Sequence, residues 1–145
     1  MNEQNTDIMK KAFPNVFRER FYFECGDGWF ELLGKAAAFI NSTTDKCYIV
    51  QAKEKFGTLR IYIANEYDED GESLVDGEAL SKIYDFINHL EKQSRNICED
   101  CGVEIAMANR MNQKKMGYWI RNICKGCGEA YVKRQDRKTV ITDKG

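Results

Sequence analysis

The sequence predicts an α+β fold, with a small antiparallel sheet packed by two helices and followed by a four-cysteine zinc module. Three observations lead to this prediction. Residues 47–64 alternate apolar and polar side chains around a turn, residues 29–41 and 78–94 carry apolar side chains at helical spacing, and two CxxC pairs lie near the C-terminus. We expect the module to resemble either a treble clef or a zinc ribbon.

The hairpin is the clearest element of the first part. CYIVQAKEKF (47–56) and LRIYIA (59–64) flank Gly57-Thr58, which suits a type II′ turn because glycine tolerates positive φ at the first turn position. A loop at Phe56-Gly57 would change the pairing but leave both faces of the hairpin unchanged. One face carries Glu54 with an apolar set, and the other carries a polar set: Ala52, Phe56, Leu59, Ile61 and Ile63 against Gln51, Lys53, Lys55, Arg60 and Tyr62.

The segments before the hairpin predict a third strand and two helices. FYFEC (21–25) is aromatic and alternating, so we expect a sheet of at least three strands. The helix at 29–41 has Asp27 available as an N-cap. Residues 5–18 predict a short helix interrupted at Pro14.

After the hairpin, residues 65–78 are polar and acidic, and we expect a solvated connection. Their spacing does not match the calcium loop of an EF-hand. The helix that follows, at 78–94, has an apolar stripe that includes Ile83 and Ile87 and would pack on the hairpin. His89, the only histidine, is expected on the surface of this helix.

We expect three parts in the chain: an α+β domain at 1–92, the four-cysteine zinc-binding module at 93–137 and a C-terminal tail at 138–145. The net charge of −1 hides an asymmetry between them. Residues 1–92 carry 11 Lys/Arg and 17 Asp/Glu, whereas residues 93–145 carry 11 and 6. Four thiolates around one Zn²⁺ would lower the second balance by about 2. A solvated basic face explains this excess, and a nucleic-acid site is the alternative.

The chain writes nearly the same string twice, as RNICEDCG (95–102) and RNICKGCG (121–128). Thiolates satisfy the tetrahedral preference of Zn²⁺, and two residues between cysteines let both sulfurs reach one ion. Glycines after the second cysteine of each pair, Gly102 and Gly128, would relieve a tight turn. We therefore expect one structural Zn²⁺ per chain, with no ligand position left open, held by Cys98, Cys101, Cys124 and Cys127.

Two further predictions complete the module. Residues 105–107 and 118–120 are expected to pair as a β-hairpin between the CxxC loops, and Ile97 and Ile123 to pack beside the metal. The segment after Cys127 looks helical. A helix here gives a treble clef, whereas a zinc ribbon lacks it.

The cysteine pattern also bears on the compartment. The N-terminal residues MNEQNTDIMKK have no apolar stretch of a secretory signal, so we expect a cytoplasmic protein, in which paired CxxC units favour metal over disulfides. No segment approaches the ~20 apolar residues of a membrane span, and no membrane partner is expected. Cys25 and Cys47 are expected to be ordinary buried residues.

A second candidate site combines ECGDGW (24–29) with KEKFGTLRIY (53–62). A glycine-rich turn before a helix exposes backbone N–H groups that can hold an anion, cations on the hairpin add charge, and an aromatic ring can stack on a base. Against this, Asp27 would repel an anion, and ion pairs with Glu24 or Asp27 explain the same residues without a ligand. The candidate ligand- or partner-binding residues are Glu24, Asp27, Trp29, Lys53, Lys55, Arg60 and Tyr62.

Enzyme signatures do not occur in the sequence. It contains none of the GxGxxG, GxxxxGK[ST], GxSxG and HExxH motifs, and one histidine offers little for a Ser/His or Cys/His dyad. A hydrolase built on carboxylates remains open, because Glu24, Asp27 and Glu54 could converge. We favour a protein that is not an enzyme.

Several motifs together resemble a known family. FECGDGW, QAKEKFGTLRIYI, ICEDCG and a GYW before the last CxxC are similar to the pattern of small uncharacterised proteins of bacteriophages and prophages, over residues 21–128. The chain departs from that pattern at Thr58, where a second glycine is common, at the inserted Tyr118, and in the basic extension after Cys127. The resemblance implies a viral or prophage origin and work in the host cytoplasm, but no substrate.

Three functions follow as hypotheses. The first is a non-enzymatic, zinc-stabilised binding protein that engages a host macromolecule, with a host protein as the expected partner. The second is a protein that sequesters a small nucleotide or signal. The third is a nucleic-acid-binding protein that uses the basic C-terminal module with Tyr118 or Trp119, through Arg110, Lys114, Lys115, Lys133, Arg134, Arg137 and Lys138.

Overall fold

The computed structural model describes residues 1–117 and 120–143, and it has the predicted α+β architecture. A two-stranded antiparallel sheet is accompanied by helices, and the four cysteines of the repeat come together near the C-terminal helix. The elements in chain order are α1 (Glu3–Ala12), a 3₁₀ turn (Asp27–Trp29), α2 (Phe30–Thr43), β1 (Cys47–Lys55), β2 (Thr58–Asn65), α3 (Gly77–Ser94), a 3₁₀ turn (Met107–Asn109), α4 (Gln113–Met116) and α5 (Lys125–Asp143).

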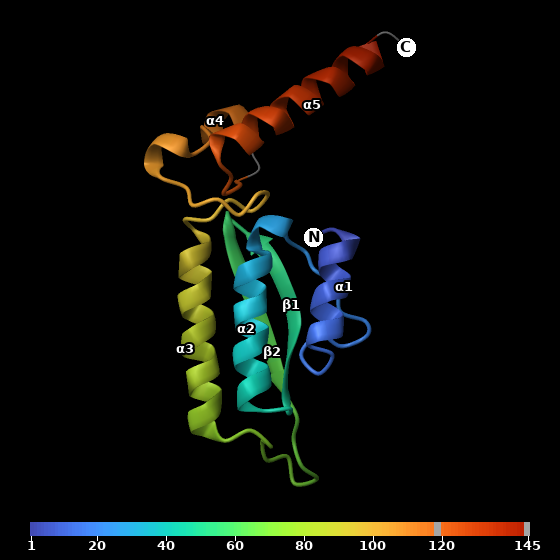
Figure 1. Ribbon diagram of the computed structural model, residues 1–145, viewed down its shortest axis with the longest axis vertical. Helices are drawn as coiled ribbons and strands as arrows, with labels where there is room; N and C mark the ends of the chain where they lie inside the picture. Colours follow the sequence, from blue (N-terminus) through green and yellow to red (C-terminus); the bar gives the residue numbers. More distant parts are fainter. Residues whose placement is uncertain (118–119, 144–145) are drawn as a thin grey trace.

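Helices α2 and α3 lie side by side against the hairpin, as predicted, and α1 lies next to β1 (Figure 1). The apolar sides of these elements meet in one core, in which Trp29, Leu33, Ile40 and Leu59 are among the largest fully buried side chains. The cysteine-rich segment sits at one end of this layered body, and α5 projects beyond it (Figure 1). The loop at 65–76 lies at the opposite end.

The hairpin turn is at Phe56-Gly57, the predicted alternative position, and not at the favoured Gly57-Thr58. Lys55 pairs with Thr58, and both loop residues have positive φ, +53° at Phe56 and +79° at Gly57. This is the type I′ geometry, whose backbone twist matches that of the flanking strands. The strand residues keep the predicted face, since Ala52, Leu59 and Ile61 are buried, but Phe56 lies in the loop and is 72% exposed.

The predicted third strand at 21–25 is wrong. Only Glu24 pairs with the sheet: its N–H donates to the Ala52 carbonyl (2.9 Å), and its carbonyl accepts from the Glu54 N–H (3.2 Å) in a parallel bridge. The physical reason is an aromatic cluster. The rings of Phe17, Phe21 and Phe23 lie with centroids 4.9–5.1 Å apart, so the side chains pack on one another instead of alternating across a strand.

The outer edge of β2 is covered by side chains of α3. The Leu59 N–H donates to Ser94 Oγ and the Ile61 N–H donates to Glu91 Oε1, each at 2.9 Å. Unpaired edge groups are a template for unwanted strand pairing, so covering them with a helix protects a sheet of only two strands. These bonds also fix the last turn of α3 directly before the first CxxC loop.

The first two helices begin and end differently from the prediction. Helix α1 spans Glu3–Ala12 and ends just before the predicted interruption at Pro14, because the residue before a proline is disfavoured in a helical conformation; residues 14–18 do not continue it. Asp27 is not the N-cap of α2. Its carboxylate accepts the Asn2 N–H (2.8 Å) and the Asn5 side-chain amide (3.1 Å), which ties α1 to the glycine-rich turn.

The later helices bear on the predicted division of the chain. Helix α3 is confirmed with His89 exposed, and it crosses the predicted 92/93 boundary. Helix α5 continues to Asp143, so residues 138–143 are helical rather than a separate tail. Each of the two larger parts contains its own cluster of buried apolar side chains, and the boundary itself stays a prediction.

The first CxxC loop rests on the glycine-rich turn of ECGDGW. The Gly28 N–H donates to the Glu99 carbonyl (2.6 Å), and Trp29 Nε1 donates to the Ile97 carbonyl (3.0 Å). A methyl group at Gly28 would overlap the carbonyl oxygen of Cys98, and one at Gly26 would overlap that of Glu99. Glycine is therefore required here for close backbone approach.

We expect Gly28→Ala to lower the free energy of unfolding by at least about 3 kcal/mol, because backbone atoms cannot move aside as a flexible side chain does. Chemical denaturation measures this loss. Gly77→Ala is the matched control: a methyl group there meets nothing within 4 Å, so stability should stay or rise slightly. Equal stability of the two variants would contradict the close approach.

Candidate metal centre

The four predicted cysteines of the repeat form one cluster. The Sγ atoms of Cys98, Cys101, Cys124 and Cys127 all lie within 4.8 Å of one another, and the Cys101 and Cys124 sulfurs are 3.8 Å apart. Four thiol sulfurs gathered from two loops 26 residues apart form a donor set that could hold one metal ion. The prediction that the two CxxC pairs come together in one cluster is confirmed.

The two CxxC loops are shaped by different elements. In the first, the Cys98 N–H donates to the Val103 carbonyl and the Gly102 N–H donates to the Cys98 carbonyl, both at 2.9 Å, with Gly102 at φ +79° as predicted. The second loop is the first turn of α5. Gly128 donates to the Cys124 carbonyl there and has no positive φ, so its predicted role as turn glycine is wrong.

The segment between the loops is not the predicted hairpin in its described part. Residues 105–107 form no strand; a 3₁₀ turn begins at Met107, and α4 follows, while residues 118–119 lie outside the described residues. The reason is a small core in which Ile105, Met111 and Met116 turn towards Cys98 and Ile123. A helix after the second loop is the feature expected of the treble clef rather than of the zinc ribbon.

The surroundings of the thiols shift their pKa values in different directions. Burial raises the pKa of Cys98 and, together with hydrogen bonds from Cys124 and Cys101, that of Cys127. At Cys124, burial would raise the pKa, but hydrogen bonds to the sulfur, chiefly from the Cys127 backbone N–H, outweigh burial and lower it. A bound cation would favour the thiolate form of all four.

Glu99 supplies the anion at the glycine-rich turn. The residue is 4% exposed, Oε2 accepts the Gly26 N–H at 3.2 Å, and Oε1 accepts from Arg121 Nη2 at 3.0 Å. Arg121 also pairs with Asp100 at 2.5 Å. Burial raises the pKa of the Glu99 carboxyl, and the bonds from Arg121 oppose that rise. The N–H groups proposed for a ligand are therefore already satisfied within the chain.

Asn122 joins the two loops to the body. It is 3% exposed; its side-chain amide donates to the Ser94 carbonyl at 2.7 Å, and its backbone carbonyl accepts the Glu99 N–H at 3.0 Å. Ile123 packs beside the cysteines as predicted, whereas Ile97 packs against the main core. Sequence reasoning missed Glu99, Arg121 and Asn122, although the repeated Arg-Asn-Ile was a visible signal.

The seven residues proposed for a ligand do not form one site. Trp29 is completely buried and cannot stack on a ligand, and Glu24 accepts a hydrogen bond from the Gln51 amide at 2.8 Å. Lys53 lies over the Tyr62 ring, 5.7 Å from its centroid. Asp27 is bonded to α1, Lys55 lies over the ring of Phe56, and Arg60 pairs with Glu91 of α3.

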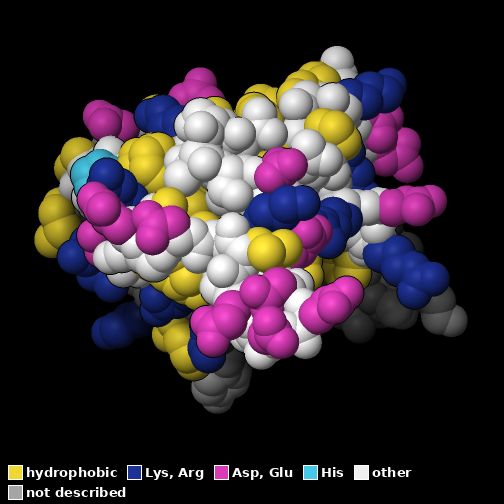
Figure 2. Space-filling view, turned by 90° about the horizontal axis from the view of Figure 1, so that it is seen from below, with side chains coloured by type: hydrophobic (Ala, Val, Ile, Leu, Met, Phe, Trp, Pro, Cys, Tyr) yellow, Lys and Arg dark blue, Asp and Glu magenta, His cyan; other side chains and the backbone are white. Residues whose placement is uncertain are grey.

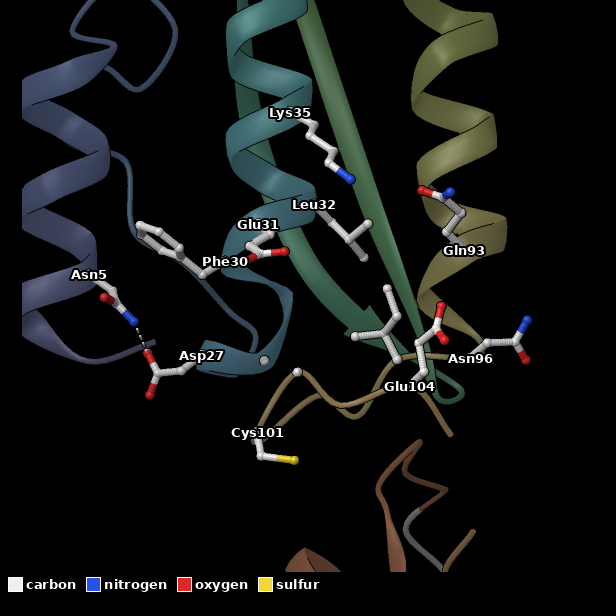
Figure 3. Close-up of a pocket in the computed structure, with 13 residues that line it drawn as sticks. Asn5, Asp27, Phe30, Glu31, Leu32, Lys35, Gln93, Asn96, Cys101 and Glu104 are labelled. Atoms are coloured by element: carbon white, nitrogen blue, oxygen red, sulfur yellow. Dashed lines mark hydrogen bonds between the residues drawn. The ribbon is translucent and has the colours of Figure 1, made fainter. Parts of the chain in front are cut away.

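A hollow of about 650 Å³ lies beside the first loop, between α2, the end of α3 and Cys101 (Figure 3). Asp27, Glu31 and Glu104 line it, with Lys35 as the only cation among its lining residues. Its acidic lining would repel the anion that the glycine-rich turn was predicted to bind. At the candidate anion site in ECGDGW, the Gly26 and Gly28 N–H groups are both bonded to Glu99, which favours the alternative interpretation without a ligand.

The two remaining cysteines are buried, as predicted. Cys25 is 7% exposed and Cys47 is fully enclosed. Burial, followed by the charge of Glu99, raises the pKa of the Cys25 thiol to about 12, and burial also raises that of Cys47. Both thiols stay protonated at neutral pH, a state with little nucleophilic reactivity.

Among the described residues, no helix has both the length and the apolar content to cross a membrane. Comparison with family models, with curated proteins and with solved structures found no match to this chain.

We expect thiol alkylation to separate the six cysteines into two classes. In metal-loaded protein few labels should appear; after chelation, intact-mass spectrometry should show four labels, on the cluster cysteines. Cys25 and Cys47 should react only after denaturant is added, because burial keeps them inaccessible and protonated. Rapid labelling of all six thiols in loaded protein would contradict both the metal site and the burial of this pair.

We expect Glu99→Gln to lower the free energy of unfolding by about 2 kcal/mol, since a buried charge-assisted bond to Arg121 is lost while the guanidinium stays. Urea denaturation of the metal-loaded protein measures the change. Glu104→Gln removes the same charge from an exposed side chain in the same loop and should have no measurable effect. Equal effects would show that the Glu99 carboxylate does not hold the turn.

Proposed function

We propose that this protein is a non-enzymatic binding protein, stabilised by one structural Zn²⁺, whose partner is nucleic acid. The zinc assignment rests on the donor set. Four thiolates about 2.3 Å from a tetrahedral Zn²⁺ would lie about 3.8 Å apart. The Cys101–Cys124 separation of 3.8 Å already meets this value. With all four positions taken by cysteine, the ion would contribute stability rather than activate water.

The observation that carries the nucleic-acid proposal is the exposed basic side of α5. Lys133, Arg134, Arg137 and Lys138 recur at helical spacing on a helix that projects beyond the body (Figure 1). At about 100° per residue these four cover one side, and Glu129 and Asp136 fall on another. Projecting cations in such a row can neutralise successive phosphates of a nucleic-acid backbone.

The same helix is poorly suited to a groove on a protein partner. Tyr131 and Val132 are half-buried against the small core around the cysteines, and the side chains at 133–139 are all exposed and polar or charged. A helix that binds in a protein groove presents apolar anchors at i, i+3 or i+4, and i+7. The absence of such anchors at 133–139 favours nucleic acid over a host protein as the partner of α5.

Charge is also separated along the molecule. Residues 65–78 contain seven Asp or Glu and no Lys or Arg, and acidic side chains gather on the end of the molecule away from the cysteines (Figure 2). Helix α5, which carries the four basic residues, lies at the other end (Figure 1). Such a distribution orients a protein with its basic end towards a polyanion even at a net charge of −1.

The resemblance to bacteriophage and prophage proteins adds a setting to the proposal. It supports work in the cytoplasm of an infected bacterial host, where the macromolecule engaged would be host or viral nucleic acid. A host protein remains the alternative partner, and a pull-down from host lysate that survives nuclease treatment would favour it.

We expect the protein to bind a fluorescent oligonucleotide with an affinity that falls steeply with salt. The variant Lys133→Gln/Arg134→Gln/Arg137→Gln should bind at least about tenfold more weakly at low salt, and its slope of log K against log[salt] should be shallower by about 2 to 3. Fluorescence anisotropy measures both quantities.

The matched control removes three lysines far from α5: Lys11→Gln/Lys35→Gln/Lys82→Gln. These side chains are exposed, so the folded state should tolerate their loss. The control should bind like the unaltered protein. No binding by the unaltered protein at low salt, or equal loss in both triple variants, would sink the proposal.

A further inference from the structure

A cleft of about 560 Å³ lies between the hairpin tip and the segment that leads into the second CxxC loop. This volume is in the range of small-molecule sites. Its twelve lining residues include four arginines and no Asp or Glu: Arg60, Arg95, Arg110 and Arg121. The cleft shares Asn96 with the acidic hollow of Figure 3 but is otherwise lined by different residues, and no described residue of α5 lines it.

The four arginines differ in whether a carboxylate already pairs with the guanidinium group. Arg121 pairs with Glu99 and Asp100, and Arg60 lies 3.8 Å from Glu91. No carboxylate of the described residues is within ion-pairing distance of Arg95 or Arg110. The cleft therefore holds two guanidinium groups whose charge the described part of the chain does not compensate.

Arg110 is nevertheless held in place. Its guanidinium donates to the Asn122 side-chain oxygen and, at 3.0 Å, to the backbone carbonyl of Arg95. Both acceptors are uncharged, so these bonds orient the side chain and leave its positive charge available. A guanidinium fixed in this way loses little further freedom on binding a phosphate.

Phe56, at the rim of the cleft, is costly for the fold. It has φ +53°, a left-handed conformation that is uncommon for a bulky residue and that Asn, Asp or Gly adopts more easily in this turn. The residue is 72% exposed, so burial does not offset the strain. Lys55 Nζ lies 5.9 Å from the ring centroid and adds a cation beside it. An exposed ring in a strained position points to contact with a ligand.

We propose that this cleft binds an unpaired nucleotide of single-stranded nucleic acid, with a phosphate at Arg95 and Arg110 and a base stacked on Phe56. Exposed aromatic rings beside cationic grooves are the common means of holding single strands, whereas the bases of a duplex are stacked on one another and cannot reach such a ring. This proposal rests on the proposed function and names its substrate class: single strands rather than duplex.

The decisive variant is Phe56→Asn, because Asn relieves the strained turn while removing the ring. Its melting temperature should stay or rise. Binding of a fluorescent oligothymidylate should weaken by about tenfold, while binding of a duplex of equal length should change little. Tyr67→Asn removes another exposed ring, from the acidic end, and should leave both affinities unchanged.

Arg95→Gln tests the phosphate contact independently. Its exposed side chain has no partner within the described residues, so folding should be unaffected, and the salt slope for the oligothymidylate should become shallower by about one. Arg20→Gln, which removes one exposed arginine from another side of the molecule, is its control. Its slope should stay unchanged.

The outcomes separate this proposal from the one on which it rests. If the unaltered protein binds no oligonucleotide, both fail. If the α5 variant loses binding while Phe56→Asn and Arg95→Gln bind like the unaltered protein, the cleft proposal alone fails. Equal loss of single-strand and duplex affinity in Phe56→Asn would overturn the preference for an unpaired nucleotide, and a fall in its melting temperature would show that Phe56 is there for the fold.

Discussion

The rest of the structure depends on the contact between the first CxxC loop and the glycine-rich turn at residues 26–28. Two carbonyl oxygens of the loop lie where side chains would stand at Gly26 and Gly28, and the buried Glu99 carboxylate accepts the Gly26 N–H. Trp29, fully buried in the main core, completes the contact through its indole N–H. A metal ion bound by the four cysteines would order this loop and, through the contact, the start of α2 and the core behind it, so its affinity would be linked to folding stability.

Local patterns in the sequence predicted what is decided locally. The helices at 29–41 and 78–94, the buried face of the hairpin and the four cysteines all follow from spacing within a few residues. The failures share another cause. The third strand does not form because the phenylalanine rings at 17–23 pack on one another. At the candidate anion site, the Gly26 N–H is bonded to the carboxylate of Glu99, which is 73 residues away in the sequence. The periodicity of apolar residues along the chain cannot show which distant carboxylate will accept a hydrogen bond from a given backbone N–H group.

The duplicated Arg-Asn-Ile illustrates the same limit. Identical letters suggested identical packing, yet Ile123 enters the small core by the cysteines and Ile97 the main one. Arg121 is held by Glu99 and Asp100, whereas Arg95 has no carboxylate partner among the described residues. The repeat therefore supplies the two halves of one four-cysteine cluster that could hold a metal ion, and the surroundings give each copy its own packing and ion pairs.

Within the KEKFGTLRIY motif, some residues make contacts that stabilise the fold, whereas one residue is strained and exposed. In KEKFGTLRIY, Glu54 accepts the Gly57 N–H, Gly57 lies against Asn122, and Leu59 fills the core. Phe56 alone is both strained and exposed, and the Lys55 ammonium lies 5.9 Å from the centroid of its ring. Because selection for stability would favour Asn or Gly there, the proposed contact with a ligand accounts for a ring kept at that cost, and the neighbouring Arg95 and Arg110 would favour an anionic ligand.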